Sequence, residues 1–237
     1  MGDDTAAGPA RRAASKVASV SALTVERVAT PRGELVLRRA GEHYEIVSNG
    51  TFLMDTRDGR SERLLVDAAL DWAAAPRPRV LIGGLGVGFS LAAAVARPAV
   101  ASVTVVEVEP AVIAWQRGPL AACSGGAAGD PRVSLVRADL VRLAAEAGPA
   151  YDAICLDVDN GPDWTVVDGN AALYTAGGLA ALRRRLTPGG VLAVWSASAV
   201  PAFEARLRTA FPSVAVHEVP VDRGEPDRVY LARTATR

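Results

Sequence analysis

From about residue 79 onward, short apolar runs alternate with segments whose apolar residues repeat at helical spacing. The runs are three to six residues long and rich in valine, isoleucine and leucine, which predicts strands buried in a sheet. The strands are expected at residues 80–82, 103–108, 133–136, 154–156, 191–195, 214–219 and 229–232. Helices are expected at 89–96, from Pro110 onward, and at 140–147, 171–186 and 203–210, with turns or loops at 123–130 and 188–190. This alternation predicts an α/β fold: a doubly wound, mostly parallel, Rossmann-like sheet with helices on both faces.

The pattern before residue 79 is different. Alternating residues at 34–39, 44–48 and 51–54 predict antiparallel strands, and Asn49-Gly50 is a strong tight-turn signal between the last two. Ser61 is placed to cap a helix in which Leu64, Leu65, Ala68 and Trp72 repeat at helical spacing. We therefore divide the chain into a mobile tail at 1–21, a small N-terminal antiparallel β-unit at 22–60 and the α/β domain at 61–237.

Composition narrows the class of protein. The chain has 237 residues, half of them hydrophobic, which is enough for one substantial core. Basic and acidic residues balance at 26 each, so no strong field favours a nucleic acid or an anionic membrane. No apolar run reaches the length of a membrane span, and two cysteines and two histidines fit neither a disulfide framework nor a metal site. We expect a cytoplasmic protein.

A glycine turn follows the first strand of the α/β domain. Gly83, Gly84, Gly86 and Gly88 lie between that strand and the 89–96 helix, and Glu107 comes at the end of the next strand. Glycine lets the backbone bend sharply and bring helix N-terminal amides close to a ligand, and an acid at this distance is placed to bind ribose hydroxyls. A dinucleotide fingerprint would need glycine at position 89 or 91, where the chain has phenylalanine and leucine. The G-x-G-x-G spacing that is present is typical of folds that bind S-adenosylmethionine (SAM). The alternative is a tight strand–helix turn that binds no nucleoside.

Three acids end successive predicted strands. Because the carboxyl ends of parallel strands meet at one edge, Glu107, Asp139 and Asp157 should face one crevice. Glu107 would bind ribose hydroxyls, Asp139 the exocyclic amine of adenine, and Asp157 a sulfonium or an amine acceptor. The alternative for each is a solvated loop acid or a helix cap. Two further candidates for contact with substrate are Trp164, in the loop after Asp157, and Tyr174. The alternative for each is a packing role.

These residues resemble the spermidine synthase (polyamine aminopropyltransferase) group within the class I SAM-methyltransferase fold. The resemblance runs from about Gly33 to the C-terminus and includes VTVVEVEP, DPRVSLVRADL, YDAICLDVDNGP, the Leu173-Tyr174 pair and LTPGGVLAVWS. It implies that Glu107 binds ribose, that Asp139, followed by Leu140, binds adenine, and that Asp157 lies beside the reacting amine. In such enzymes an amine attacks the carbon next to a sulfonium and 5′-methylthioadenosine leaves.

The chain departs from the family at several positions. The aspartate that holds the tail amine of decarboxylated SAM is replaced by Gly86, and the second aspartate of the D-x-x-D loop falls at Asn160, next to Asp159. The Tyr-Gln pair that contacts polyamine aligns with Ser61-Glu62, where Glu62 can attract a cationic amine or simply favour the helix dipole. Ile82 stands where methyltransferases usually carry an acid. Neither template fits completely.

We therefore expect a transferase that alkylates an amine or another small nucleophile with SAM or decarboxylated SAM, by aminopropyl, methyl or aminocarboxypropyl transfer. The catalytic candidates are Asp157, Asp159, Asn160 and Tyr174, and the substrate-side candidates are Glu62 and Trp164. The alternative is a catalytically silent nucleoside-binding or assembly module. A nicotinamide oxidoreductase is disfavoured by Phe89 and Leu91. By resemblance, a homodimer is expected, with no nucleic acid or membrane partner.

Overall fold

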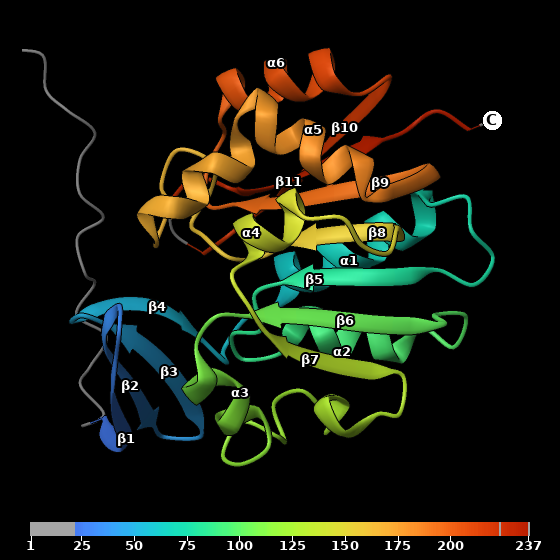
Figure 1. The fold of residues 1–237 in the computed structure, drawn as a ribbon. Helices are drawn as coiled ribbons and strands as arrows, with labels where there is room; N and C mark the ends of the chain where they lie inside the picture. The colour runs from blue at the N-terminus through green and yellow to red at the C-terminus, as the bar shows by residue number, and fades with distance from the viewer. Residues whose placement is uncertain (1–21, 223, 237) are drawn as a thin grey trace, which may run out of the picture.

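A seven-stranded sheet and a four-stranded sheet make up the fold of the computed structural model (Figure 1), which describes residues 22–222 and 224–236. The tail expected at 1–21 lies outside the described residues. The strands are β1 (Leu23–Thr30), β2 (Gly33–Ala40), β3 (His43–Ser48), β4 (Thr51–Asp55), β5 (Arg79–Gly83), β6 (Ser102–Glu107), β7 (Val133–Arg137), β8 (Tyr151–Leu156), β9 (Leu186–Ser196), β10 (Ser213–Val219) and β11 (Asp227–Arg233). The helices are α1 (Arg60–Trp72), α2 (Phe89–Ala96), α3 (Pro110–Gln116), α4 (Leu140–Ala145), α5 (Ala176–Arg184) and α6 (Pro201–Ala210), with 3₁₀ helices η1 (Ala127–Gly129) and η2 (Asp168–Tyr174).

The large sheet has the order β10-β11-β9-β8-β5-β6-β7. The five strands from β9 to β7 are parallel, and β11 and β10 add to this sheet in antiparallel register. The chain enters this sheet at β5 and adds β6 and β7 on one side of it. It then crosses back to add β8 and β9 on the other side of β5. This order creates a switch point between β5 and β8, where an open sheet typically binds ligands beyond its strand ends. The predicted doubly wound, mostly parallel sheet is confirmed.

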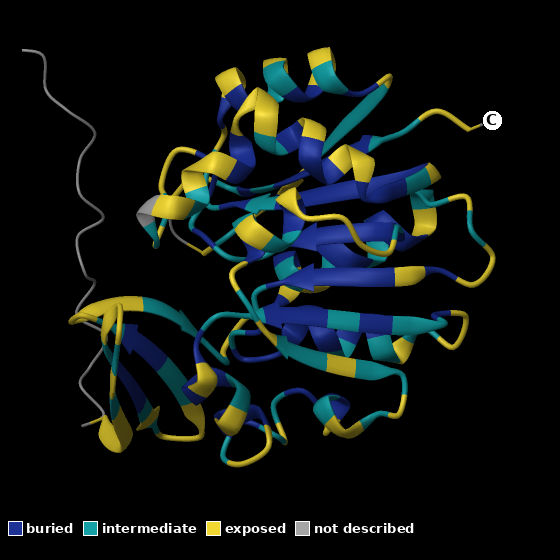
Figure 2. Cartoon of the chain, viewed as in Figure 1, coloured by how far each residue is buried: buried dark blue, intermediate teal, exposed yellow. Residues whose placement is uncertain are grey.

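Both faces of the large sheet are covered by helices. Along β5, Val80 and Ile82 belong to the core on one face, where α1, α2 and α3 pack, whereas Leu81 belongs to the other. The second face is covered by α4, α5 and α6, with Phe203 of α6 fully buried there. The central strands are accordingly the most buried part of the molecule (Figure 2). Successive side chains of a strand point to opposite faces, so an apolar run without alternation fits a strand buried on both sides.

The small sheet has the order β1-β2-β3-β4, with every pair antiparallel. It lies beside the carboxyl-terminal ends of the parallel strands, the edge to which the arrows of β5 to β8 point (Figure 1). Asn49 has a positive φ of 49° and Gly50 one of 78°, as the tight turn between β3 and β4 requires. The β-unit therefore lies where it can cover the carboxyl-terminal edge of the parallel strands.

Several predicted elements were wrong. β1 was not predicted from the sequence, because its side chains are mostly exposed and lack a clear alternation. The helix expected at 171–186 is divided into η2 and α5, because Thr175 caps α5 by accepting a hydrogen bond from Gly178 N–H. The turn expected at 188–190 lies inside β9, next to a register irregularity between β8 and β9. Ser61 is not the cap of α1: Gly59 precedes the helix, and Ser61 lies within it.

Candidate active site

The glycine turn between β5 and α2 is held by positive φ angles and by close neighbours. Gly84, Gly86 and Gly88 have φ values of 89°, 47° and 93°. A Cβ at Gly84 would overlap the backbone carbonyl of Asp157, and one at Gly88 would lie 2.8 Å from Cβ of Ser124. Both conformation and space therefore require glycine in this turn. The turn opens the eight-residue helix α2, whose first N–H groups have no partner inside the helix.

Glu107, the last residue of β6, is bound to this turn. Its Oε2 accepts a hydrogen bond from Leu85 N–H at 3.1 Å, and its Oε1 accepts one from Glu109 N–H at 2.8 Å. Burial raises the pKa of Glu107, while the backbone hydrogen bonds act in the opposite direction. A carboxylate has about four acceptor positions, so capacity for ribose hydroxyls remains.

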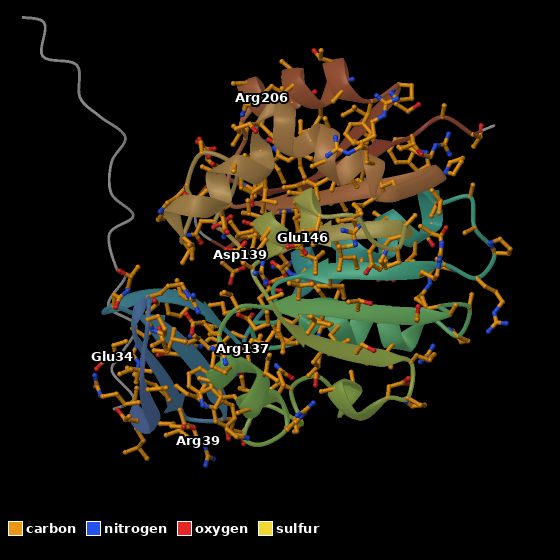
Figure 3. All side chains as sticks on the ribbon, viewed as in Figure 1. Glu34, Arg39, Arg137, Asp139, Glu146 and Arg206 are labelled. Atoms are coloured by element: carbon orange, nitrogen blue, oxygen red, sulfur yellow. The ribbon has the colours of Figure 1, made fainter. Side chains whose placement is uncertain are left out.

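Asp139 follows β7 and caps α4. Its carboxylate accepts a hydrogen bond from Arg142 N–H at 3.1 Å, and the side chain is exposed at the carboxyl-terminal edge of the sheet (Figure 3). Leu140 is buried, and its side chain lies so close to Gly83 that a Cβ there would overlap it. The helix-cap role that the sequence left open is therefore present, and it leaves the second carboxylate oxygen available to a ligand.

Asp157, directly after β8, forms a pair of neighbouring acids with Glu62 from the first turn of α1. Asp157 Oδ2 accepts a hydrogen bond from Ser90 Oγ at 2.8 Å. Burial raises the pKa of Asp157 to about 6, and burial together with the charge of Asp157 raises the pKa of Glu62 to about 8. Among the described residues, no basic side chain forms a hydrogen bond or an ion pair with either carboxylate. Two close carboxylates without a cation form an environment that favours binding of an ammonium group.

Ser61 and Asp227 extend this acidic cluster. Ser61 Oγ lies 2.9 Å from Asp227 Oδ2 and 3.1 Å from Glu62 Oε2, and Asp227, the first residue of β11, is buried. The charge of Asp227 also raises the pKa of Glu62. Asp227 and Ser90 were not predicted as site residues from the sequence, and Ser61 was predicted to be a helix cap. The one available signal was an acid at the start of the final apolar strand.

Asp159 is surrounded by donors from its own loop. Oδ1 accepts hydrogen bonds from Val166 N–H at 2.7 Å and from Asn170 Nδ2 at 3.0 Å, while Oδ2 accepts one from the Tyr174 hydroxyl at 2.8 Å. Burial raises the pKa of Asp159 and is the main cause of a raised pKa for Tyr174. These three hydrogen bonds therefore fold the loop around the buried carboxylate of Asp159.

The rest of this loop is held at both ends. The carbonyl of Asn160 accepts a hydrogen bond from Ala197 N–H at 2.9 Å. The carbonyl of Tyr174 accepts one from Nε of Arg206, which Figure 3 labels on α6, at 3.1 Å. Trp164 is 53% exposed between these anchors. The structure thus brings Glu62 and Asp157 together and leaves Trp164 on the surface of the loop.

Within the residues that the structure describes, no three His, Cys, Asp or Glu side chains form a group that could hold a metal ion. In that same part of the chain, no helix combines the length and apolar character needed to cross a membrane.

Curated relatives match most of this chain. A polyamine aminopropyltransferase of Mycobacterium tuberculosis is 31% identical over 170 residues, which is 70% of this chain and 31% of that protein. Polyamine aminopropyltransferase 1 of Streptomyces coelicolor is 36% identical over 125 residues, covering 52% of this chain and 23% of that protein. The chain spans about a third or less of the length of these relatives. No family model matches the chain.

Solved structures share the fold. A spermidine synthase in complex with the transition-state analogue AdoDATO superimposes with a TM-score of 0.75 at 18% identity, over 91% of this chain and 75% of that chain. Spermidine synthase from Thermotoga maritima gives a TM-score of 0.73 at 17% identity, over 91% of this chain and 74% of that chain. A human methyltransferase-like protein 13 in complex with SAH gives 0.57 at 22% identity, over 73% of this chain and 82% of that chain. At these identities the likeness establishes the fold alone.

Proposed function

Because the chain is a spermidine synthase-like homologue of the polyamine aminopropyltransferases, we propose that it transfers an alkyl group from a SAM-type sulfonium nucleoside to a small amine. Aminopropyl transfer is the form of this reaction that the names of the relatives suggest. The nucleoside would lie along the carboxyl-terminal edge of the large sheet. Glu107 would hold its ribose, Asp139 and Leu140 its adenine, and the Gly83–Gly88 turn its tail.

One observation carries the proposal: Glu62 and Asp157 are neighbouring, partly buried carboxylates, and no basic side chain of the described residues pairs with either. Desolvation and mutual repulsion make their ionised forms costly in the free protein. An ammonium group between them would offset both effects and favour their ionisation. The acceptor amine therefore supplies the charge that the site lacks.

The chemistry follows from this placement. The acceptor nitrogen attacks a carbon bonded to the sulfonium; the new N–C bond forms as the C–S bond breaks, and its electron pair stays on sulfur in a neutral thioether nucleoside. Asp157, with a pKa of about 6, takes the proton that the nitrogen loses, and Glu62 positions the amine. Asp159, Asn160 and Tyr174 shape the loop over the acceptor.

A substitution at Asp157 tests this assignment. We expect Asp157→Asn to lower release of the thioether nucleoside by about 100-fold or more, because the base and one of the two negative charges are lost. Putrescine would serve as the probe amine, with SAM and decarboxylated SAM assayed in parallel. The matched control is Asp163→Asn, an exposed acid of the same loop, which should leave turnover unchanged. Unchanged turnover by Asp157→Asn would contradict the proposal.

A catalytically silent nucleoside-binding module is the second candidate. It is favoured by Asp159, whose two oxygens accept three hydrogen bonds from its own loop, and by Asn160 at the place of the second family aspartate. This candidate predicts nucleoside binding with no turnover of any amine.

We further propose that the protein is cytoplasmic and forms a homodimer. Sedimentation of the purified chain would test the dimer.

A further inference from the structure

The tail end of the proposed nucleoside site is closed by a residue of the small sheet. Gly86 lies at the middle of the glycine turn, and a Cβ built on it would overlap Sδ of Met54 and lie 3.0 Å from its Cε. Met54 belongs to β4, so the N-terminal β-unit reaches into the turn. At the position where the family carries an aspartate, this chain has glycine. The neutral thioether of Met54 occupies the space that the Cβ of an aspartate would need.

Gln116, at the end of α3, holds the same turn from another element. It is 1% exposed, its Nε2 donates a hydrogen bond to the carbonyl of Gly86 at 3.0 Å, and its Oε1 has no partner among the described residues. A Cβ at Gly88 would lie 2.9 Å from both ends of this amide, so Gln116 packs directly against the turn. The carbonyl of Gly86 therefore already accepts one hydrogen bond from the protein, which engages one of its two lone pairs.

The orientation of this peptide determines what the turn presents. In a trans peptide the C=O and N–H bonds point in opposite directions, so the N–H of Val87 points away from Gln116. In residues 22–222 and 224–236, neither the N–H of Gly86 nor that of Val87 donates to a protein acceptor. Both precede α2, whose N-terminal dipole also favours negative charge. The turn thus presents donors where the family presents an acid.

The neighbouring acids do not replace the missing aspartate. Glu107 accepts the N–H groups of Leu85 and Glu109, and its remaining acceptor positions are assigned to the ribose in the proposed function. Asp157 is bound to Ser90 on α2, beside Glu62 in the proposed acceptor site. The amine of a decarboxylated tail would therefore meet a thioether and N–H donors at Gly86, whereas a carboxylate would find hydrogen-bond donors there.

We propose that Met54, Gly86 and Gln116 select a sulfonium nucleoside whose tail keeps its carboxylate, that is, intact SAM. This inference rests on the proposed function, since it assumes that the turn binds the tail of the nucleoside. It restricts the transferred group to methyl or 3-amino-3-carboxypropyl. Attack on the methyl carbon leaves S-adenosylhomocysteine, and attack on the propyl carbon leaves 5′-methylthioadenosine.

Calorimetric titration of the full chain with three nucleosides separates this inference from the proposed function. 5′-Methylthioadenosine has no amino-acid tail and reports on the nucleoside site alone. We expect it to bind, and we expect SAM to bind about ten-fold or more tightly than decarboxylated SAM, the ratio typical of hydrogen bonds to a charged group. If 5′-methylthioadenosine failed to bind, the proposed function would fail. If it bound while decarboxylated SAM bound as tightly as SAM or more tightly, only the inference about the tail would be overturned.

A double substitution tests the residues themselves. Met54→Ala with Gly86→Asp restores the family's acid and clears the space for it, and aspartate is among the residues that tolerate a positive φ. We expect the preference to reverse toward decarboxylated SAM, whereas the control Met54→Ala should still prefer SAM. A folded double variant, checked by its thermal unfolding, that kept the preference for SAM would overturn the assignment.

Discussion

At the scale of single residues, the unusual feature is the pair of acids at the proposed acceptor site. Burial dominates the raised pKa of both Glu62 and Asp157, and Ser90 is the one group among the causes that lowers the pKa of Asp157. Carboxylates in this state are rarely kept for stability, because each is easier to ionise in the unfolded chain. Their cost to folding therefore supports a role in binding.

This cost predicts how stability depends on pH. An acid whose pKa is raised on folding stabilises the folded chain below its unfolded pKa and loses that contribution as pH rises through the folded pKa. Stability should therefore fall between about pH 4 and pH 8, with the contribution of Asp157 lost by about pH 6 and that of Glu62 by about pH 8.

Glu62→Gln should flatten the upper part of this dependence and raise the free energy of unfolding at pH 8 by on the order of 1 kcal/mol. Urea denaturation across this pH range would measure it. Glu42→Gln, at an exposed hairpin position, is the matched control and should follow the unsubstituted chain. An equal slope for Glu62→Gln and Glu42→Gln between pH 6 and pH 8 would contradict the explanation.

At the scale of elements, the segment after β8 shows how one side chain organises a loop. Asp159 accepts hydrogen bonds from residues seven, eleven and fifteen positions later, and so brings η2 back against the end of β8. The break between η2 and α5 is local, because Thr175 accepts a hydrogen bond from Gly178 N–H at 3.1 Å as the cap of α5. A Cβ at Gly178 would also overlap the carbonyl of Ala172, so the two helices meet closely.

Removing this carboxylate should loosen the loop. Asp159→Ala leaves three donors without their acceptor, and we expect a loss of about 2–3 kcal/mol in the free energy of unfolding. Limited proteolysis should cut faster between residues 160 and 174, while cleavage elsewhere stays the same. The control Asp163→Ala removes an exposed acid from the same loop and should change neither measurement. Unaltered cleavage in Asp159→Ala would mean that the loop does not depend on this carboxylate.

At the scale of the whole molecule, the small sheet is joined to the large domain just after β6, the strand that ends at Glu107. Arg32 donates from Nε to Glu109 Oε1 at 2.6 Å and also bonds the carbonyl of Val108. Trp115 Nε1 donates to Glu26 Oε2 at 2.7 Å. Because Met54 of the small sheet covers Gly86, this docking also sets the shape of the proposed tail site.

The docking contact should contribute measurably to stability. Arg32→Ala leaves Glu109, a buried carboxylate, without its cation, and we expect a loss of about 1–3 kcal/mol in the free energy of unfolding. The control Arg27→Ala removes an exposed ion pair with Glu34 on the same sheet and should cost about 0–1 kcal/mol. Denaturation with guanidinium chloride would compare them, and equal losses would contradict this account of the docking.

Much of the fold could be predicted because its signals are local. The apolar runs, the glycine turn and the Asn49-Gly50 turn each reflect the conformational preferences of adjacent residues. The strand-end positions of Glu107, Asp139 and Asp157 followed from the parallel topology, which places successive strand ends at one edge. Their individual roles as ligand contacts stay predictions.

The contacts that give the candidate site its character needed the tertiary structure. Ser61 and Asp227 are 166 positions apart, and Ser90 and Asp157 are 67 apart. Met54 reaches Gly86 from a different sheet, and Gln116 reaches it from α3. Such pairings depend on the order of strands and the docking of the β-unit, which no local pattern encodes. Local residue preferences therefore specified the elements and the edge at which the proposed site lies, whereas long-range packing decided which side chains meet there.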